Sequence, residues 1–279
     1  MAVEPEYVFT RDYLDNSRIN LQHYQWVQLF GYHLHAQIPL GNEELRIADV
    51  ATGTGIWLTD MSTRLPPTTQ LDGLDISLKS TPPGQWLPPN VTFRLWDVKQ
   101  AVPEDLVEKY DVVHVRLLIF VLRDDEIPVV LQNIMSLIKP GGYLQWEDID
   151  VGSFRTERIN PTNKIDALDR LFALSRAQDS RLRSTWVPQL ANQFSAANLC
   201  NVQVDKRDAH GHLGMAMHEC NLMVPELLCR TTRDAEAADR LARLLAEAAE
   251  ETRQGAYWAL TRWTVVGQKP GKRDAGVRL

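Results

Sequence analysis

The sequence is short of cysteine, of positive charge and of long apolar runs, and each shortage excludes a class of protein. The three cysteines among 279 residues, Cys200, Cys220 and Cys229, are odd in number and do not form the close pairs of a metal site. Acidic residues outnumber basic ones by 36 to 30, and the net charge of −6 disfavours a nucleic-acid partner. No apolar stretch approaches the roughly 18 residues of a membrane span, and the N-terminus lacks the pattern of a signal peptide. We therefore expect a cytoplasmic protein that binds neither nucleic acid nor membrane.

Strand and helix patterns alternate between residues 46 and 150, and such alternation predicts a parallel sheet buried on both faces. After residue 150 helices predominate, with two further strands. The expected strands lie at 45–50, 70–77, 91–98, 110–118, 143–150, 202–209 and 262–270. The expected helices include 56–65, 105–110, 125–138, 163–178, 186–198 and 233–253. We expect an N-terminal helical segment over 1–40, a main domain with helical cap insertions over 41–270, and a flexible tail over 271–279.

The most informative segment runs from Ile47 to Gly55 and reads IADVATGTG. An apolar run ends in Asp49, a loop containing Gly53 follows, and a helical pattern begins directly after the loop. Glycine is favoured where φ is positive or where the backbone passes close to a ligand. The segment therefore predicts the strand–loop–helix entry of a doubly wound α/β sheet.

Three acids, Asp49, Asp75 and Asp97, stand at the ends of successive strand patterns. In an open α/β sheet, ligands lie across these strand ends. An acid about 20 residues beyond the glycines is placed to accept hydrogen bonds from ribose hydroxyls, and an acid after the third strand can accept from an adenine amine. A dehydrogenase loop would carry a third glycine where this chain has Leu58, so the pattern disfavours a dinucleotide.

The series DVATGTG, LDGLDIS, LWDV, YDVVHVR and IKPGGYLQWED resembles the class I, Rossmann-like methyltransferases, which use S-adenosylmethionine. The resemblance covers residues 46–150 strand for strand. RINLQHYQWVQLFGY, GTGIWL and HVRLL resemble more closely the small-molecule methyltransferases of fungal secondary metabolism, in particular the N-methyltransferases of epidithiodiketopiperazine pathways. The implied fold is α/β, a doubly wound and mostly parallel seven-stranded sheet with the last strand antiparallel, together with N-terminal helices and a helical cap.

The resemblance also implies which residues hold the cofactor. Asp49 would lie against the methionine part, Asp75 against the ribose and Asp97 against the adenine. His114 would border the methionine amine, and the guanidinium of Arg18 would pair with the methionine carboxylate. The full cofactor-binding set that we expect is Arg18, Asp49, Ala51, Gly53, Asp75, Ile76, Asp97, Val98 and His114. In this set Ala51 replaces the first glycine of the family motif and is small enough for the turn.

Methyl transfer requires mainly alignment, which can contribute roughly 7–11 kcal/mol, and a base helps when the acceptor is a hydroxyl or an amide. The expected catalytic residues are Glu147, His23 and Arg116. The expected substrate-binding residues are aromatic side chains and the methionines of an adaptable cap: Tyr13, Trp26, Trp146, Met215 and Met217. The histidines near residues 33 and 212 lack an HExxH or CxxC motif, and methyl transfer needs no metal, so we expect no metal site.

The predicted function is therefore S-adenosylmethionine-dependent O- or N-methylation of a small natural product, by a monomer or a homodimer. The alternative is a protein that keeps the cofactor site without methylating, either as a cyclisation catalyst or as a regulator of secondary metabolism. A methyltransferase acting on macromolecules is disfavoured by the acidic charge of the chain.

Overall fold

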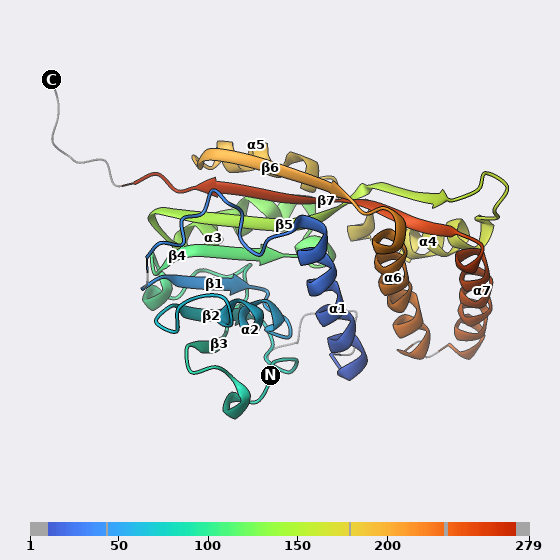
Figure 1. Ribbon diagram of the computed structural model, residues 1–279, viewed down its shortest axis with the longest axis horizontal. Helices are drawn as coiled ribbons and strands as arrows, with labels where there is room; N and C mark the ends of the chain where they lie inside the picture. Colours follow the sequence, from blue (N-terminus) through green and yellow to red (C-terminus); the bar gives the residue numbers. More distant parts are fainter. Residues whose placement is uncertain (1–10, 43, 179, 232–233, 272–279) are drawn as a thin grey trace, which may run out of the picture.

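One seven-stranded sheet, in the order β3-β2-β1-β4-β5-β7-β6, forms the centre of the computed structural model (Figure 1). The structure describes residues 11–42, 44–178, 180–231 and 234–271. Strands β1 to β5 pair in parallel, whereas β7 is antiparallel to both β5 and β6. The strands are β1 (Arg46–Val50), β2 (Gln70–Asp75), β3 (Val91–Leu95), β4 (Tyr110–Arg116), β5 (Ile138–Arg158), β6 (Cys200–Asp208) and β7 (Ala256–Gln268). The predicted fold class is confirmed.

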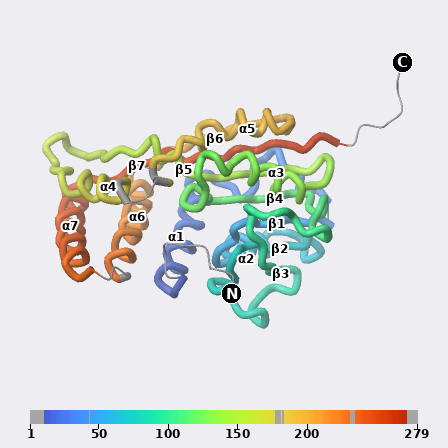
Figure 2. The backbone as a smooth tube through the Cα atoms, turned by 180° about the vertical axis from the view of Figure 1, so that it is seen from behind, coloured from blue at the N-terminus to red at the C-terminus, as the bar shows by residue number. Residues whose placement is uncertain are grey.

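Helices cover both faces of the sheet, as a doubly wound fold requires. One face packs against α2 and the segment 34–45, and the other packs against α3 and α5, which Figure 2 shows from behind. Helix α1 stands at the carboxyl ends of the parallel strands, with α6 and α7 beyond it (Figure 1). The helices are α1 (Tyr13–Phe30), α2 (Ile56–Ser62), α3 (Ile127–Leu137), α4 (Asp166–Gln178), α5 (Leu190–Ala196), α6 (Gly211–Thr231) and α7 (Ala235–Arg253).

Alternation along the central strands decides which side chains face which helix layer, because neighbouring residues of a strand point to opposite faces. In β1, Ala48 and Val50 pack with α3, whereas Ile47 packs with α2. All three side chains are at most 1% exposed. Asp49 therefore lies on the face covered by α2.

The cap has a hydrophobic core of its own, separate from the cores beneath α2 and α3. Strands β5 and β7 run beyond the other strands, where residues 155–158 of β5 pair with residues 256–259 of β7. Helices α4 and α7 pack against this extension. The buried members of the cap core are Ala167, Leu168, Leu171, Leu244, Ala248, Ala256 and Trp258.

Three predictions of local structure differ from the structure or extend beyond the described residues. The helix expected at 105–110 is only a 3-10 turn at Glu104–Leu106, because so few residues cannot sustain an isolated α-helix and Tyr110 already begins β4. Among the described residues up to 40 there is one α-helix, α1, which ends at Gly31 with a left-handed φ of 78°. Residues 272–279 of the expected tail lie outside the described residues. The domain boundary at residue 40 stays a prediction.

Candidate functional site

The glycine loop after β1 closes onto the end of β2. Ala51 donates its N–H to the Leu74 carbonyl at 2.7 Å, and Gly53 donates its N–H to Asp75 Oδ2 at 2.9 Å. Gly53 and Gly55 have φ values of 57° and 74°, and Ala51 has a φ of 58°, which is uncommon for a residue with a side chain. Ala51 thus adopts the left-handed turn that a glycine would adopt more easily.

The acids that end β2 and follow β3 are held by backbone N–H groups. Besides Gly53, the carboxylate of Asp75 accepts from the Ser77 N–H at 3.0 Å, and Asp97 accepts from the Lys99 N–H at 2.9 Å. Burial raises the pKa of Asp75, although the two backbone hydrogen bonds oppose this rise. Both carboxylates are consequently fixed in position at neighbouring strand ends.

A buried row of charged groups crosses three adjacent strands on the face covered by α2. His114 Nδ1 lies 2.7 Å from Asp49 Oδ1, and His114 Nε2 lies 3.2 Å from Glu147 Oε2. The strand register brings them together, because Asp49 of β1 pairs with His114 of β4, which pairs with Gln145 of β5, two residues before Glu147. The Trp57 ring of α2 stacks on the imidazole at 4.0 Å between centroids.

Both ring nitrogens of His114 face carboxylate oxygens in this row, and this arrangement favours the protonated imidazolium. Burial alone would lower the pKa of His114, but its hydrogen bonds to Asp49 and Glu147 outweigh burial and raise that pKa. Asp49 also accepts from the Thr52 hydroxyl at 2.6 Å, and Glu147 accepts from the Gln145 side-chain amide at 2.8 Å. The imidazolium is therefore held between two hydrogen-bonded carboxylates.

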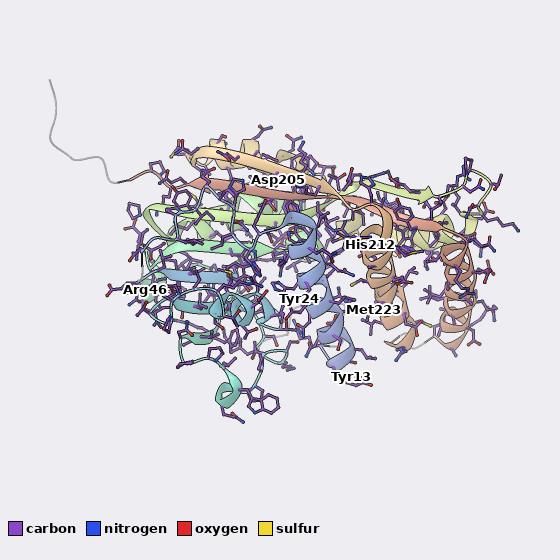
Figure 3. The ribbon with its side chains drawn as sticks, in the orientation of Figure 1. Tyr13, Tyr24, Arg46, Asp205, His212 and Met223 are labelled. Carbon is purple, nitrogen blue, oxygen red and sulfur yellow. The ribbon has the colours of Figure 1, made fainter. Side chains whose placement is uncertain are left out.

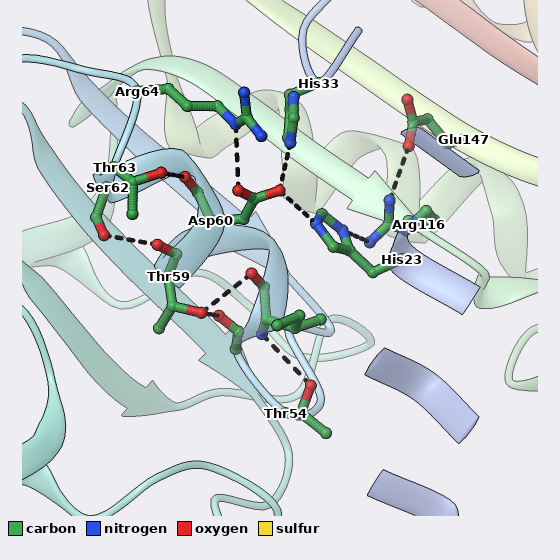
Figure 4. A network of polar contacts seen from close by, with 12 residues as sticks. His23, His33, Thr54, Thr59, Asp60, Ser62, Thr63, Arg64, Arg116 and Glu147 are labelled. Atoms are coloured by element: carbon green, nitrogen blue, oxygen red, sulfur yellow. Dashed lines mark hydrogen bonds and ion pairs between the residues drawn. The ribbon is translucent and has the colours of Figure 1, made fainter. Parts of the chain in front are cut away.

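The row continues outward to α1 and α2 through Arg116, as Figure 4 shows. Arg116 Nη1 lies 3.6 Å from Glu147 Oε2, and Arg116 Nη2 lies 2.9 Å from His23 Nδ1. His23 Nε2 and His33 Nε2 lie 2.9 and 2.6 Å from the same oxygen, Asp60 Oδ2. Burial and the nearby Arg116 charge lower the pKa of His23 to about 4, so its imidazole is neutral at pH 7.

Comparison with known proteins identifies the family. Residues 22–204, more than half of the chain, match the family described as "Methyltransferase domain". The chain belongs to this methyltransferase family. It is 38% identical over 144 residues to the methyltransferase grgD of a Penicillium species, covering 49% of this chain and 50% of grgD. It is 31% identical over 153 residues to the N-methyltransferase gliN of Aspergillus fumigatus, covering 53% of each.

The chain spans about half the length of these curated relatives. Among solved structures, a candidate sarcosine dimethylglycine methyltransferase of Galdieria sulphuraria superposes with a TM-score of 0.50 at 14% identity, covering 96% of this chain and 94% of that protein. A likeness at this level of identity supports the fold alone. Within the described ranges, none of the helices combines the length and the apolarity needed to cross a bilayer.

The structure brings together most of the residues expected to bind cofactor or to act in catalysis. The continuous row consists of Asp49, His114, Glu147, Arg116 and His23. Ala51 and Gly53 lie in the adjoining loop, and the Gly53 N–H binds Asp75 at the end of β2. Ile76 is partly exposed beyond β2, and the Val98 carbonyl accepts from Asn133. The functional roles of these residues stay predictions.

Arg18 lies apart from this row, on the side of α1 that faces α6. Its guanidinium pairs with Asp15 at 2.7 Å, and its carbonyl lies 3.7 Å from the Cys220 sulfur of α6. Both side chains of the pair are almost fully buried. A ligand carboxylate at Arg18 would therefore share the guanidinium with Asp15.

The five residues expected to contact substrate are spread over the structure. Trp26 is buried on α1, with the Arg116 guanidinium 5.9 Å from its ring, and Met215 and Met217 lie on α6. Tyr13 is 76% exposed at the outer end of α1 (Figure 3). Trp146 packs against Trp186 in the core beneath α3, on the opposite face of the sheet from the charged row.

His218, on the same helix as the methionines, has a structural environment. It is buried, its Nδ1 accepts from the Trp258 N–H at 3.0 Å, and its Nε2 lies 2.8 Å from the Thr252 hydroxyl. Burial lowers the pKa of His218 to about 4. The residue thereby ties α6 to α7 and β7 as a neutral imidazole.

Acidification should weaken folding through His218. Between pH 6.5 and 4 the unfolded state takes up a proton at this residue and the folded state does not, so stability present above pH 6.5 is lost as the pH falls, by up to about 3 kcal/mol. The variant His218→Gln, which has no titrating group at this position, should lose less stability over that range. Thermal unfolding from pH 7 to pH 4 measures the difference, and equal pH slopes for both proteins would contradict it.

Proposed function

We propose that this domain binds S-adenosylmethionine at the carboxyl ends of β1, β2 and β3 and transfers its methyl group to an oxygen or a nitrogen of a small natural product. One observation carries the proposal. In a chain of the methyltransferase family, the glycine loop and the fixed carboxylates of Asp75 and Asp97 lie at the ends of three neighbouring strands.

The chemistry of these groups fits the cofactor. Carboxylates accept hydrogen bonds, as ribose hydroxyls and an adenine amine require. A Cβ at Gly53 would come no closer than 4.0 Å to Ala51 O or to the Ile19 side chain, so the loop leaves room for close approach. When bound, the cofactor supplies a methyl group on a positively charged sulfur. Asp49 and His114 would lie on the methionine side, and Asp75 and Asp97 on the nucleoside side.

The residues of the chain would orient the acceptor and exclude water. Helix α1 is tied to α6 by the hydrogen bond from Gln25 Nε2 to the Ala216 carbonyl at 2.8 Å. We expect the substrate between Trp26 on α1, the β5 position of Glu147, and the methionines of α6. Orientation of this kind can supply roughly 7–11 kcal/mol of a reaction barrier.

The small-molecule acceptor is supported by the named relatives and by charge. The relatives include the N-methyltransferase gliN, and the net charge of −6 disfavours a nucleic-acid substrate. We also propose a cytoplasmic location, which is supported by the free thiols of all three cysteines.

The proposed function is tested with purified protein, methyl-labelled S-adenosylmethionine and extracts of the source organism. A methyltransferase should release S-adenosylhomocysteine in step with a product that gains one methyl group. A product that gains no methyl, formed without consumption of cofactor, would replace the proposal by cyclisation. Cofactor binding with no product in any extract would favour a regulatory protein.

A further inference from the structure

The carboxylate of Asp60 is a node that joins three segments of the chain. His23 belongs to α1, His33 to the segment after α1, and Arg64 follows α2, which carries Asp60 itself. Arg64 Nε lies 3.1 Å from Asp60 Oδ1, while the two imidazoles share Oδ2 (Figure 4). These hydrogen bonds lower the pKa of Asp60 to about 2 against the opposing effect of burial, so Asp60 is ionised.

The node also determines which nitrogen of His23 carries the proton. Arg116 has only donors, so the nitrogen 2.9 Å from its Nη2, His23 Nδ1, must accept. A neutral imidazole that accepts at Nδ1 carries its proton on Nε2, and Nε2 lies 2.9 Å from the Asp60 carboxylate, which accepts it. Both contacts select the same tautomer.

We propose that Asp60 and His33 are positioning residues for Arg116: they hold His23 as the Nε2–H tautomer, and its Nδ1 in turn fixes the guanidinium beside Glu147 at the strand ends. His33 contributes by donating to the same carboxylate oxygen, which keeps that oxygen turned toward α1. The predicted consequence for catalysis rests on the proposed function, whereas the tautomer and the position of the guanidinium do not. The proposed role of Asp60 does not require direct contact with substrate.

The side chains of His23, His33 and Asp60 offer ligand atoms within 4.8 Å of one another, as a divalent cation would require. Two features oppose a cation. His23 Nε2 carries a proton in the tautomer that Asp60 and Arg116 together select, so it has no lone pair for a metal. The guanidinium groups of Arg116 and Arg64 already place two positive charges next to His23 and Asp60. The arrangement therefore favours a hydrogen-bonded node over a metal centre.

The first test uses the ligand-free protein and requires no activity. Side-chain ¹⁵N NMR of wild type should show His23 as the Nε2–H tautomer at neutral pH. In Asp60→Asn the amide should turn its NH2 group toward the histidines, because its oxygen then accepts from Arg64, and the His23 signals should move toward the other tautomer. The matched control, Arg64→Gln, removes only the half-exposed partner and should keep the wild-type His23 spectrum.

The second test measures steady-state methyl transfer. Asp60→Asn and His33→Gln should lower kcat by about 10- to 100-fold, because small displacements of a positioned group have effects of this size. The KM for S-adenosylmethionine should stay near that of wild type, as should both constants in Arg64→Gln. If wild type has no methyl-transfer activity the proposed function fails, while the spectra still decide the positioning role.

Three outcomes would overturn the positioning role. They are a wild-type Nδ1–H tautomer, an Asp60→Asn protein with unchanged His23 signals, and unchanged kcat in an Asp60→Asn protein whose parent is active. Zinc titration distinguishes the positioning role from a metal site. Stoichiometric Zn²⁺ binding that perturbs both imidazoles and disappears in Asp60→Asn would assign the cluster to a metal instead.

Discussion

Replacement of Glu147 by alanine is expected to lower the free energy of unfolding by about 3–5 kcal/mol, because it leaves buried positive charge without its partner. Glu147 is 1% exposed and lies 3.2 Å from the charged His114 and 3.6 Å from Arg116. Burial lowers the pKa of Arg116 and the charge of Glu147 opposes this effect, so Glu147 is the nearby carboxylate that compensates the buried guanidinium. Chemical denaturation of the ligand-free proteins measures the loss.

Two further variants serve as comparisons. One removes the charge of Glu147 but keeps its shape, and the other removes an exposed carboxylate elsewhere. Glu147→Gln keeps the size and one acceptor, and we expect it to lower turnover more than cofactor affinity. Glu247→Ala removes an exposed partner of Arg170 and should change stability by about 0.5 kcal/mol or less. An alanine variant at position 147 as stable as Glu247→Ala would show that the buried row contributes little.

Replacement of Asp75 by alanine is expected to weaken S-adenosylmethionine binding by about 1–3 kcal/mol, roughly 5- to 150-fold in Kd. The variant removes the acceptor proposed for the ribose and also leaves the N–H groups of Gly53 and Ser77 without their partner. Isothermal calorimetry with the purified proteins measures the affinity directly.

The control for Asp75 is Asp105→Ala, because Asp105 is an acid on the exposed turn after β3 that pairs with Arg94 at the surface. Its affinity for the cofactor should equal that of wild type. Absence of binding by wild type, or equal binding by Asp75→Ala and wild type, would remove the assignment of this edge as the cofactor site.

The gathering of three acids at one edge of the sheet could be predicted from sequence because each strand carries its own acid. Asp49, Asp75 and Asp97 belong to separate local patterns, and parallel pairing brings the ends of those strands to one edge without further information. The antiparallel last strand was implied by the family resemblance, whereas the strand order and the register between Asp49 and His114, which places the charged row, come from the structure.

The rest of the site depends on contacts between distant residues that no local pattern reveals. Asp60 and His33 meet only because the chain turns at Gly31 and brings the following segment back over α2. The sequence therefore did not predict the contact between these two residues. The sequence could have predicted that Trp146 and Glu147 lie on opposite faces of the sheet, because adjacent residues of a strand point to opposite faces.

A second missed contact concerns Phe93 of β3. Its ring occupies the space that a side chain at Gly55 or Gly73 would need. Gly73 lies opposite Phe93 in the strand register, whereas Gly55 begins α2. The sequence indicates a glycine-rich loop. It does not indicate that the Phe93 ring leaves no space for a side chain at Gly55 or Gly73.

The separate core of the cap has a consequence for local unfolding. The residues of that core between α4, α7 and the extension of β5 and β7 do not belong to the cores that hold the central sheet. Small cooperative units open at a lower free energy than whole domains. We therefore expect the cap to open by local unfolding while the strand ends that carry Asp49, Asp75 and His114 remain folded.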